Sequence, residues 1–184
     1  MIEYEADDGM AAGAGMAVAD TRVERVFICT PDKDLAQCVT SDGRVVQFDR
    51  RQEILRDEAG VIEKWGVKPA SIPDYLALVG DTADGFPGLK GWGAKSAATL
   101  LYRYDHLENI PADSADWDVK VRSAAKLGET LVENVEDAFL FRRIATVDTE
   151  GPVIGDVDSL LYEGPKPGWE EFCERIDGQS LLRK

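Results

Sequence analysis

Three groups of carboxylate side chains recur along the 184-residue sequence, each where a helix or strand is expected to begin or end. The groups are Glu5, Asp7 and Asp8; Asp32 and Asp34; and Asp81 and Asp84. Seven carboxylates in one place would repel one another strongly unless cations neutralised them. Mg²⁺ or Mn²⁺ suits such a set, because these hard ions prefer carboxylate and water oxygens. Two such ions about 4 Å apart favour phosphodiester hydrolysis, since together they activate a water and stabilise the leaving oxygen.

The third group runs directly into a glycine-rich stretch, residues 80–96. Glycines at this density usually bring the backbone close to another group. Backbone N–H groups at the start of a helix suit a phosphate, and Lys95 and Ser96 lie where the next helix should begin. A phosphate-binding loop beside a metal site indicates a polyphosphate backbone as the substrate.

Each of these features also has a purely structural interpretation. The helix dipole favours acids in the first turn of a helix, which would account for Glu5, Asp7 and Asp8. Asp32 would serve equally well as a helix N-cap, and the glycines as part of a surface turn. Taken one at a time, the motifs leave these alternatives open.

The elements that must position these residues follow from the hydrophobic pattern. Strands are expected at Val23–Thr30 and Arg44–Phe48, and the polar segment after Phe48 is expected to be irregular. Acids that follow a strand lie at the usual active-site edge of an open α/β sheet. The pattern predicts a small α/β core, residues 1–80, followed by a helical half, residues 81–184. Helices are expected at Glu5–Ala19, Leu35–Val39, Ala59–Trp65, Ile72–Val79, Ala94–Tyr104, His106–Asn109, Asp118–Lys126, Glu129–Thr146 and Trp169–Ile176.

Composition argues against several classes of protein. No apolar run approaches membrane-spanning length, and the first residues are acidic where a secretory signal would be basic and then apolar, so we expect a cytoplasmic location. The three cysteines show no metal-type pairing, and Cys29 is expected to be a reduced core residue of the first strand. His106, the only histidine, has neither ligand-spaced neighbours nor a nucleophile beside it. A zinc site and histidine-dependent nucleophilic catalysis are therefore disfavoured.

The net charge of −14 argues against a nucleic-acid partner. Neutralising the seven acids of the three groups would leave 28 Asp and Glu against 21 Lys and Arg, which is still −7. A polyanion would therefore have to bind at a local basic face or through cations.

Four motifs follow one another in a fixed order, and a fifth closes the chain. They are Tyr4-Glu5-Ala6-Asp7-Asp8, Asp32-Lys33-Asp34, Gly80-Asp81-x-x-Asp84, Pro87-Gly88-x-x-Gly91-x-Gly93-x-Lys95, and the closing Glu171-Phe172-Cys173-x-Arg175-Ile176 followed by Leu181-Leu182-Arg183. In type, order and spacing they resemble the bacterial 5′–3′ exonucleases of the flap endonuclease superfamily, including the N-terminal nuclease domain of DNA polymerase I. The resemblance covers nearly the whole chain.

The resemblance implies an α/β fold with a partial PIN-like parallel sheet, followed by a region that contains a helix–hairpin–helix. It implies that Asp7, Asp8, Asp32 and Asp34 hold metal with help from Glu5, and that Asp81 and Asp84 complete the site of a second Mg²⁺ or Mn²⁺ ion. The hairpin would hold duplex DNA, with K⁺ as a bound cation, in nucleoid-associated repair and replication. The implied phosphate contacts are Gly88, Lys90, Gly91, Gly93, Lys95, Ser96 and Arg103, with Lys120 and Arg122 as further candidates.

The sequence departs from the family pattern at its start. The family has an aspartate-bearing first strand and a basic helical arch before the Glu5–Asp8 motif, and these are not in the sequence. We therefore expect a fragment, a misassigned start, or a truncated form that needs its missing N-terminal segment. Without its neighbours, the strand Val23–Thr30 would expose an apolar edge, which predicts poor solubility, self-association or a partner that completes the sheet.

The sequence therefore supports a metal-dependent 5′–3′ exonuclease or flap endonuclease that acts on a 5′ flap or a duplex with a single-strand junction. The alternative is a duplex-DNA-binding remnant that does not cut. A third interpretation is a protein-interaction module whose acids form only a solvated face.

Overall fold

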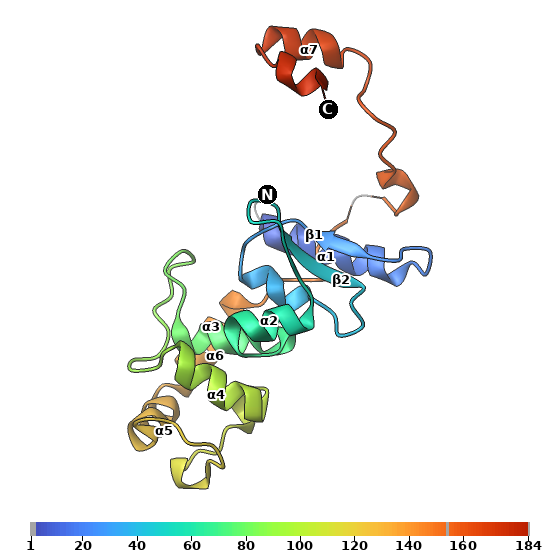
Figure 1. Ribbon diagram of the computed structural model, residues 1–184. Coiled ribbons are helices and arrows are strands. Elements are labelled where there is room, and N and C mark those ends of the chain that lie inside the picture. The colour runs from blue at the N-terminus through green and yellow to red at the C-terminus, as the bar shows by residue number, and fades with distance from the viewer. Residues whose placement is uncertain (1–2, 154, 184) are drawn as a thin grey trace. The chain divides into compact units, whose positions relative to one another are not determined.

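A computed structural model describes residues 3–153 and 155–183 (Figure 1). Met1 and Lys184, the outer limits of the two predicted domains, lie outside this part. The chain forms two compact units, Met1–Ile154 and Gly155–Lys184, which are described separately. The α/β fold class is confirmed, whereas the domain division at residue 80 stays a prediction.

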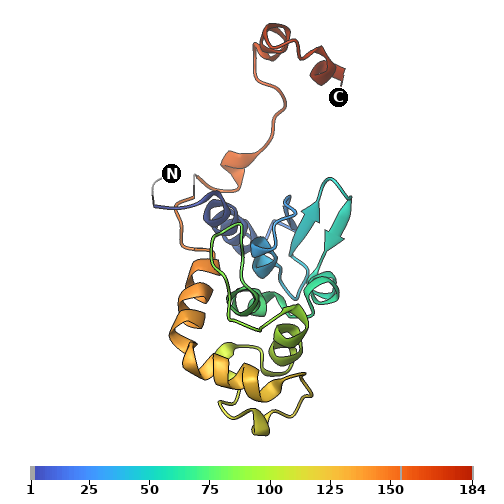
Figure 2. The same cartoon turned by 90° about the vertical axis from the view of Figure 1, so that its left-hand side faces the viewer.

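The larger unit contains a small mixed sheet with strands β1 (Val26–Ile28), β2 (Val45–Asp49) and β3 (Ile54–Arg56) in that order. Strands β1 and β2 are parallel, as expected, and β2 and β3 are antiparallel. Figure 2 shows β2 and β3 as the paired arrows of a hairpin. The expectation of an irregular segment after Phe48 was wrong, because the turn before Ile54 contains Glu53 at a φ of 56° and reverses the chain.

The sheet packs against α1 (Ala6–Ala19) and the short 3₁₀ helix η1 (Asp34–Cys38). Their shared core consists of Ala11, Ala14, Ile28, Leu35 and Val45. The alanines let the α1 backbone approach the sheet closely. Strand β1 lies at the sheet edge, and its Phe27 is 51% exposed. Self-association through this edge stays a prediction.

The expectation that Cys29 belongs to the core was wrong. Cys29 is exposed, because β1 ends one residue earlier at Ile28, and the chain then leaves the sheet toward Asp32. Among the described cysteines, Cys173 is the buried one.

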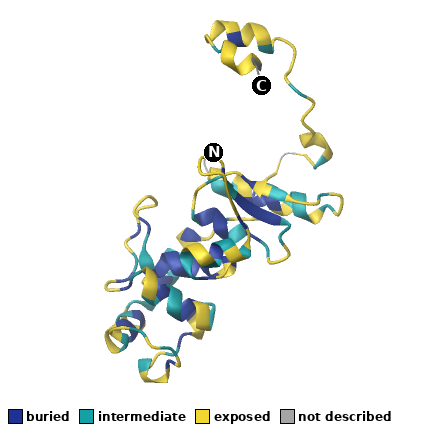
Figure 3. Ribbon diagram, in the orientation of Figure 1, coloured by how far each residue is buried: buried dark blue, intermediate teal, exposed yellow. Residues whose placement is uncertain are grey.

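A second core is built around α3 (Ile72–Val79), whose residues 72–78 are all buried (Figure 3). Helix α3 packs against α4 (Ala94–Tyr104) and α6 (Val135–Ala145), while α2 (Glu58–Trp65) ends at Gly66 in the left-handed conformation. The bounds of α3 and α4 are those expected from the sequence. Because α3 is buried on all sides, its C-terminal end at Gly80 and Asp81 is held firmly.

Two expected helices have different bounds in the structure. The segment Asp118–Ser123 is not helical, and α5 begins only at Ala124, because Ser123 adopts a φ of 61°. Asn134, with φ −123°, then separates α5 (Ala124–Glu133) from α6, so the helix expected over Glu129–Thr146 is divided.

The smaller unit contains the 3₁₀ turn η5 (Asp158–Leu160), helix α7 (Trp169–Arg175) and the 3₁₀ helix η6 (Gln179–Arg183). The rings of Trp169 and Phe172 stack with their centroids 5.8 Å apart, and Cys173 is fully buried. Within the described residues, no helix is long and apolar enough to cross a membrane.

Candidate metal centre and nucleic-acid interface

Five of the predicted carboxylates meet in two overlapping triads within the larger unit. Asp7, Asp32 and Asp34 form the first triad, and Asp34, Asp81 and Asp84 form the second. Within each triad, one oxygen of each residue lies within 4.8 Å of the others. Asp34 is common to both, so the two triads meet at this one residue. Such a pair of oxygen sites is the arrangement that a two-ion centre requires.

The loop after β1 is fixed by contacts with more distant elements. The Asp34 N–H donates to Asp32 Oδ1 at 3.2 Å, and the Gln47 amide on β2 donates to the carbonyl of Asp32. From the other side, the Gln37 amide donates to the carbonyls of Asp34 at 2.7 Å and Ala145 at 3.0 Å. The backbone that carries the Asp32 and Asp34 carboxylates is therefore held by β2 and by the end of α6.

The loop that carries Asp81 and Asp84 is closed by glycine packing. Gly80, at φ 87°, lies so close to Pro87 that a Cβ would be 2.4 Å from the Pro87 carbonyl oxygen. Gly88, at φ 69°, would place a Cβ 2.4 Å from the Gly80 nitrogen. Reciprocal hydrogen bonds of 2.9 and 3.0 Å join the backbones of Asp81 and Phe86. Gly80 and Gly88 are thus required for this backbone approach.

Asp34 has the surroundings of a cation ligand. It is 8% exposed, and its Oδ1 has no hydrogen-bond partner. Burial, followed by a hydrogen bond with Asp84 and the charge of Asp32, raises the pKa of Asp34 to about 8. Burial and the charges of Asp32 and Glu5 also raise the pKa of Asp7. A divalent cation would satisfy the free oxygen and cancel this repulsion, so the residues present fit such an ion.

One cation beside the triads was missed by sequence reasoning. The Lys33 ammonium forms an ion pair with Asp81 Oδ2. Burial is the largest single influence and acts to raise the pKa of Asp81, but the hydrogen bond and charge of Lys33 together with the backbone N–H groups of Ala83 and Asp84 outweigh it, so this pKa lies below its usual value. The only sequence signal was the position of Lys33 between Asp32 and Asp34, which does not reveal a partner 48 positions away.

Glu5 and Asp8 lie outside both triads. Asp8 Oδ2 accepts the Glu5 N–H at 2.8 Å and so caps α1, while its Oδ1 accepts the Asp148 N–H at 2.7 Å. Both oxygens of Asp8 therefore accept backbone N–H groups, and the carboxylate ties the start of α1 to the segment after α6.

A groove of about 670 Å³ lies between residues 91–99 and 120–127. Helix α4 begins in its lining at Ala94, and Ser123, the residue before α5, also lines it. Helix N-termini favour anions. The cationic side chains along it are those of Lys95, Lys120 and Arg122. This is a local basic face on an acidic chain.

The other predicted phosphate contacts differ in their surroundings. Gly91, Gly93 and Ser96 line the groove, where Ser96 Oγ accepts the Gly93 N–H at 3.1 Å and caps α4. Gly88 and Lys90 are not part of the lining. Arg103 also lies outside it, and its Nε donates to Asp118 Oδ2 at 2.6 Å. Arg103 is therefore already neutralised by an acid.

Residues 67–168 match the family described as 5′–3′ exonuclease, C-terminal SAM fold. The chain belongs to this family. This confirms the resemblance seen in the motifs, and it extends across α3, the glycine loop and the groove.

Curated relatives agree with this assignment. DNA polymerase I of Pseudomonas aeruginosa is 37% identical over 170 residues, which cover 88% of this chain and 18% of the relative. DNA polymerase I of Borreliella burgdorferi is 35% identical over 148 residues, which cover 80% of this chain and 15% of the relative. The chain thus spans less than a fifth of these relatives.

Solved structures show the same fold. A bacteriophage T5 5′-exonuclease with divalent metal ions (zinc) matches 79% of this chain and 51% of its own, with a TM-score of 0.62 and 20% identity. A bacteriophage T5 flap endonuclease in a pseudo-enzyme-product complex with DNA and metal ions matches 79% and 50%, with a TM-score of 0.60 and 21% identity. The fold of the larger unit is therefore a 5′–3′ exonuclease fold.

Proposed function

We propose that this chain provides the metal centre and the DNA-binding groove of a metal-dependent 5′–3′ exonuclease or flap endonuclease. The observation that carries the proposal is the meeting of two carboxylate triads at Asp34, a buried residue with one oxygen left without a partner. The substrate would be DNA with a 5′ flap or a single-strand junction, processed in the cytoplasm during replication or repair.

Asp7, Asp32 and Asp34 would hold one Mg²⁺ or Mn²⁺ ion, and Asp34, Asp81 and Asp84 the other. When bound, such ions supply Lewis-acid activation for phosphodiester hydrolysis. The protein's own part is to hold the carboxylates in register through the Gln47 and Gln37 contacts. Asp8 stays a predicted ligand, and since each of its oxygens already accepts one N–H, from Glu5 or from Asp148, it would coordinate the ion through a remaining lone pair.

The groove would bind the phosphates of the duplex. Lys95, Lys120 and Arg122 supply positive charge, and the first turns of α4 and α5 supply backbone N–H groups. Such contacts do not depend on the base sequence, and they weaken as salt rises. The glycine turn would also be the place for a K⁺ ion between protein and phosphate.

Cleavage of a labelled 5′-flap duplex tests the proposal. The wild-type chain is expected to cut the flap with Mg²⁺ or Mn²⁺, and Asp84→Asn is expected to abolish cutting. Asp137→Asn is the matched control, because Asp137 is an exposed acid in the first turn of α6. Cutting by Asp84→Asn at the wild-type rate, or equal loss in the control, would contradict the assignment.

The groove also favours a second function, duplex binding without cleavage. In EDTA, the chain would then bind duplex DNA by the groove alone. We expect Lys120→Gln to weaken binding and to reduce the dependence of log affinity on log salt by about one unit. Binding without any metal-dependent cutting would favour this function over the nuclease.

A further inference from the structure

Lys33 occupies an unusual position for a lysine next to predicted metal ligands. It lies between Asp32 and Asp34 in sequence, immediately before η1, yet its ammonium reaches across to Asp81 on the loop after α3. Its side chain is 34% exposed, whereas that of Asp81 is 3% exposed. The ammonium therefore reaches a buried carboxylate from the solvent side.

Both oxygens of Asp81 are engaged. Asp81 Oδ1 accepts the Ala83 N–H at 2.9 Å, and Oδ2 is paired with Lys33. Each oxygen keeps a second lone pair, so the neutral Ala83 N–H does not prevent coordination. The Lys33 ammonium does oppose it, because its positive charge would repel a divalent cation at the same carboxylate.

We propose that the Lys33 ammonium is a built-in counter-ion of the second triad, which stabilises the metal-free centre and must leave Asp81 before a divalent cation binds there. The inference rests on the proposed function in one respect, because it takes the second triad as a metal site.

Lys33 is the donor that can withdraw. The Ala83 N–H belongs to a loop held by the Asp81–Phe86 hydrogen bonds and by the close packing of Gly80 on Gly88. The lysine has a flexible four-carbon stem and partial access to solvent, so its head group can move into water. Loading of the centre would thus be an exchange of one cation for another.

This exchange predicts that the lysine lowers the affinity for the metal. An opposite charge at contact distance changes the proton affinity of a carboxylate by about one to three pKa units, so competition of about tenfold or more is expected. The same ion pair should stabilise the metal-free fold, because Asp81 would otherwise be a buried charge without a cation.

The experiment titrates Mn²⁺ alone into wild type and Lys33→Gln by calorimetry and records thermal unfolding of both in EDTA. Lys33→Gln is expected to bind Mn²⁺ about tenfold more tightly and to unfold at a lower temperature in EDTA. Lys126→Gln is the control, since it removes one positive charge from an exposed position of α5. A purely structural role for Lys33 would lower the unfolding temperature without raising the affinity.

Equal or weaker Mn²⁺ binding by Lys33→Gln, beside a wild type that binds, would overturn the inference and leave the proposed function intact. Binding by the variant alone would support it. Failure of both to bind would overturn both. If Lys33→Gln does not fold, Lys33→Arg tests the exchange instead. This variant retains the positive charge, so its affinity for Mn²⁺ should be no higher than that of wild type. Tighter binding would contradict the exchange.

Discussion

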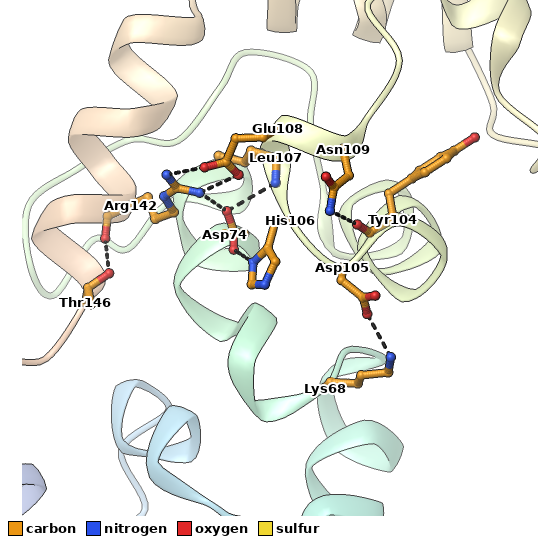
Figure 4. Close-up of polar contacts among 10 residues, drawn as sticks. All are labelled: Lys68, Asp74, Tyr104, Asp105, His106, Leu107, Glu108, Asn109, Arg142 and Thr146. Atoms are coloured by element: carbon orange, nitrogen blue, oxygen red, sulfur yellow. Dashed lines mark hydrogen bonds and ion pairs between the residues drawn. The ribbon is translucent and has the colours of Figure 1, made fainter.

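Asp34 and Asp74 are both buried carboxylates of the larger unit, but their surroundings are opposite. Asp74, 1% exposed, accepts or shares hydrogen bonds on both oxygens (Figure 4): His106 Nδ1 lies 2.8 Å from Oδ2, and Arg142 Nη1 lies 3.0 Å from Oδ1. The N–H of Leu107 adds a third contact at 3.3 Å. Asp34 instead faces the acids Asp32 and Asp84 and keeps one oxygen without a partner.

The difference separates a structural carboxylate from a proposed metal ligand. Arg142 also grips Glu108 through two hydrogen bonds of 2.7 Å, so the Asp74 network joins α3 to α6 and to the turn η3 (Leu107–Asn109). The charge of Asp74 is balanced by partners within the fold. The carboxylates around Asp34 repel one another, and a bound cation would balance their charge. Asp74 therefore helps to hold α3 in place, and the loop after α3 carries Asp81 to the second carboxylate triad.

The largest effect is expected from Asp34→Asn. This variant should lose Mn²⁺ binding measurable by calorimetry, because both triads need Asp34. In EDTA at about pH 7 its resistance to urea should be close to that of wild type, because a pKa of about 8 leaves the Asp34 carboxyl largely protonated there, and Asn is likewise neutral. Normal Mn²⁺ binding by this variant would erase the distinction between the two aspartates.

Asp74→Asn should show the opposite pattern. Asn keeps one acceptor oxygen but loses the charge that attracts Arg142 and His106, while Arg142 retains both hydrogen bonds with Glu108, so the expected cost is about 2 kcal/mol of unfolding free energy. Urea unfolding measures this cost, and calorimetry should show that the folded variant still binds Mn²⁺. A cost near zero would mean that the network does not hold α3.

His106→Ala sharpens the comparison within the network. It removes one partner of Asp74 and leaves Arg142 and Leu107 in place, so the expected loss is about 1 kcal/mol. The side chain of His106 is 44% exposed, which limits the effect. A loss as large as that of Asp74→Asn in the same urea experiment would show that His106, and not Arg142, is the principal partner.

The smallest effect concerns Glu108 and acid. Its hydrogen bonds with Arg142 lower the pKa of Glu108 from 4.5 to about 2. Because the folded pKa lies below the unfolded one, the resulting stability is present above about pH 4.5 and is lost as the pH falls toward 2. Half of the Glu108 side chain is exposed, so we expect less than about 1 kcal/mol. The urea midpoint of unfolding is measured at about pH 5 and about pH 3 for both proteins. Between these two pH values, the midpoint of Glu108→Gln should fall less than that of wild type. An equal fall would mean that other acids cause the loss of stability.

The sequence by itself determined the local features of this protein. The bounds of α3 and α4 follow from hydrophobic periodicity, and the membership of the chain in the exonuclease family follows from ordered motifs. The five acids that meet in the triads are among the seven predicted from their positions at element ends, whereas Glu5 and Asp8 lie outside both triads. Each of these signals lies within a short stretch of sequence and is readable along the chain.

Only the tertiary structure decided which charges meet. Lys33 finds Asp81, Asp8 is taken by the N–H of Asp148, and Arg142 reaches Asp74 across 68 positions. Strand β3 and the break at Asn134 likewise depend on turns and packing that leave no periodic signal. The physical reason is that electrostatic pairing depends on distance in space and on burial, which are fixed by how α3, α6 and the sheet pack together. The sequence therefore names the carboxylates of the centre, and the fold decides which of them lack a cation.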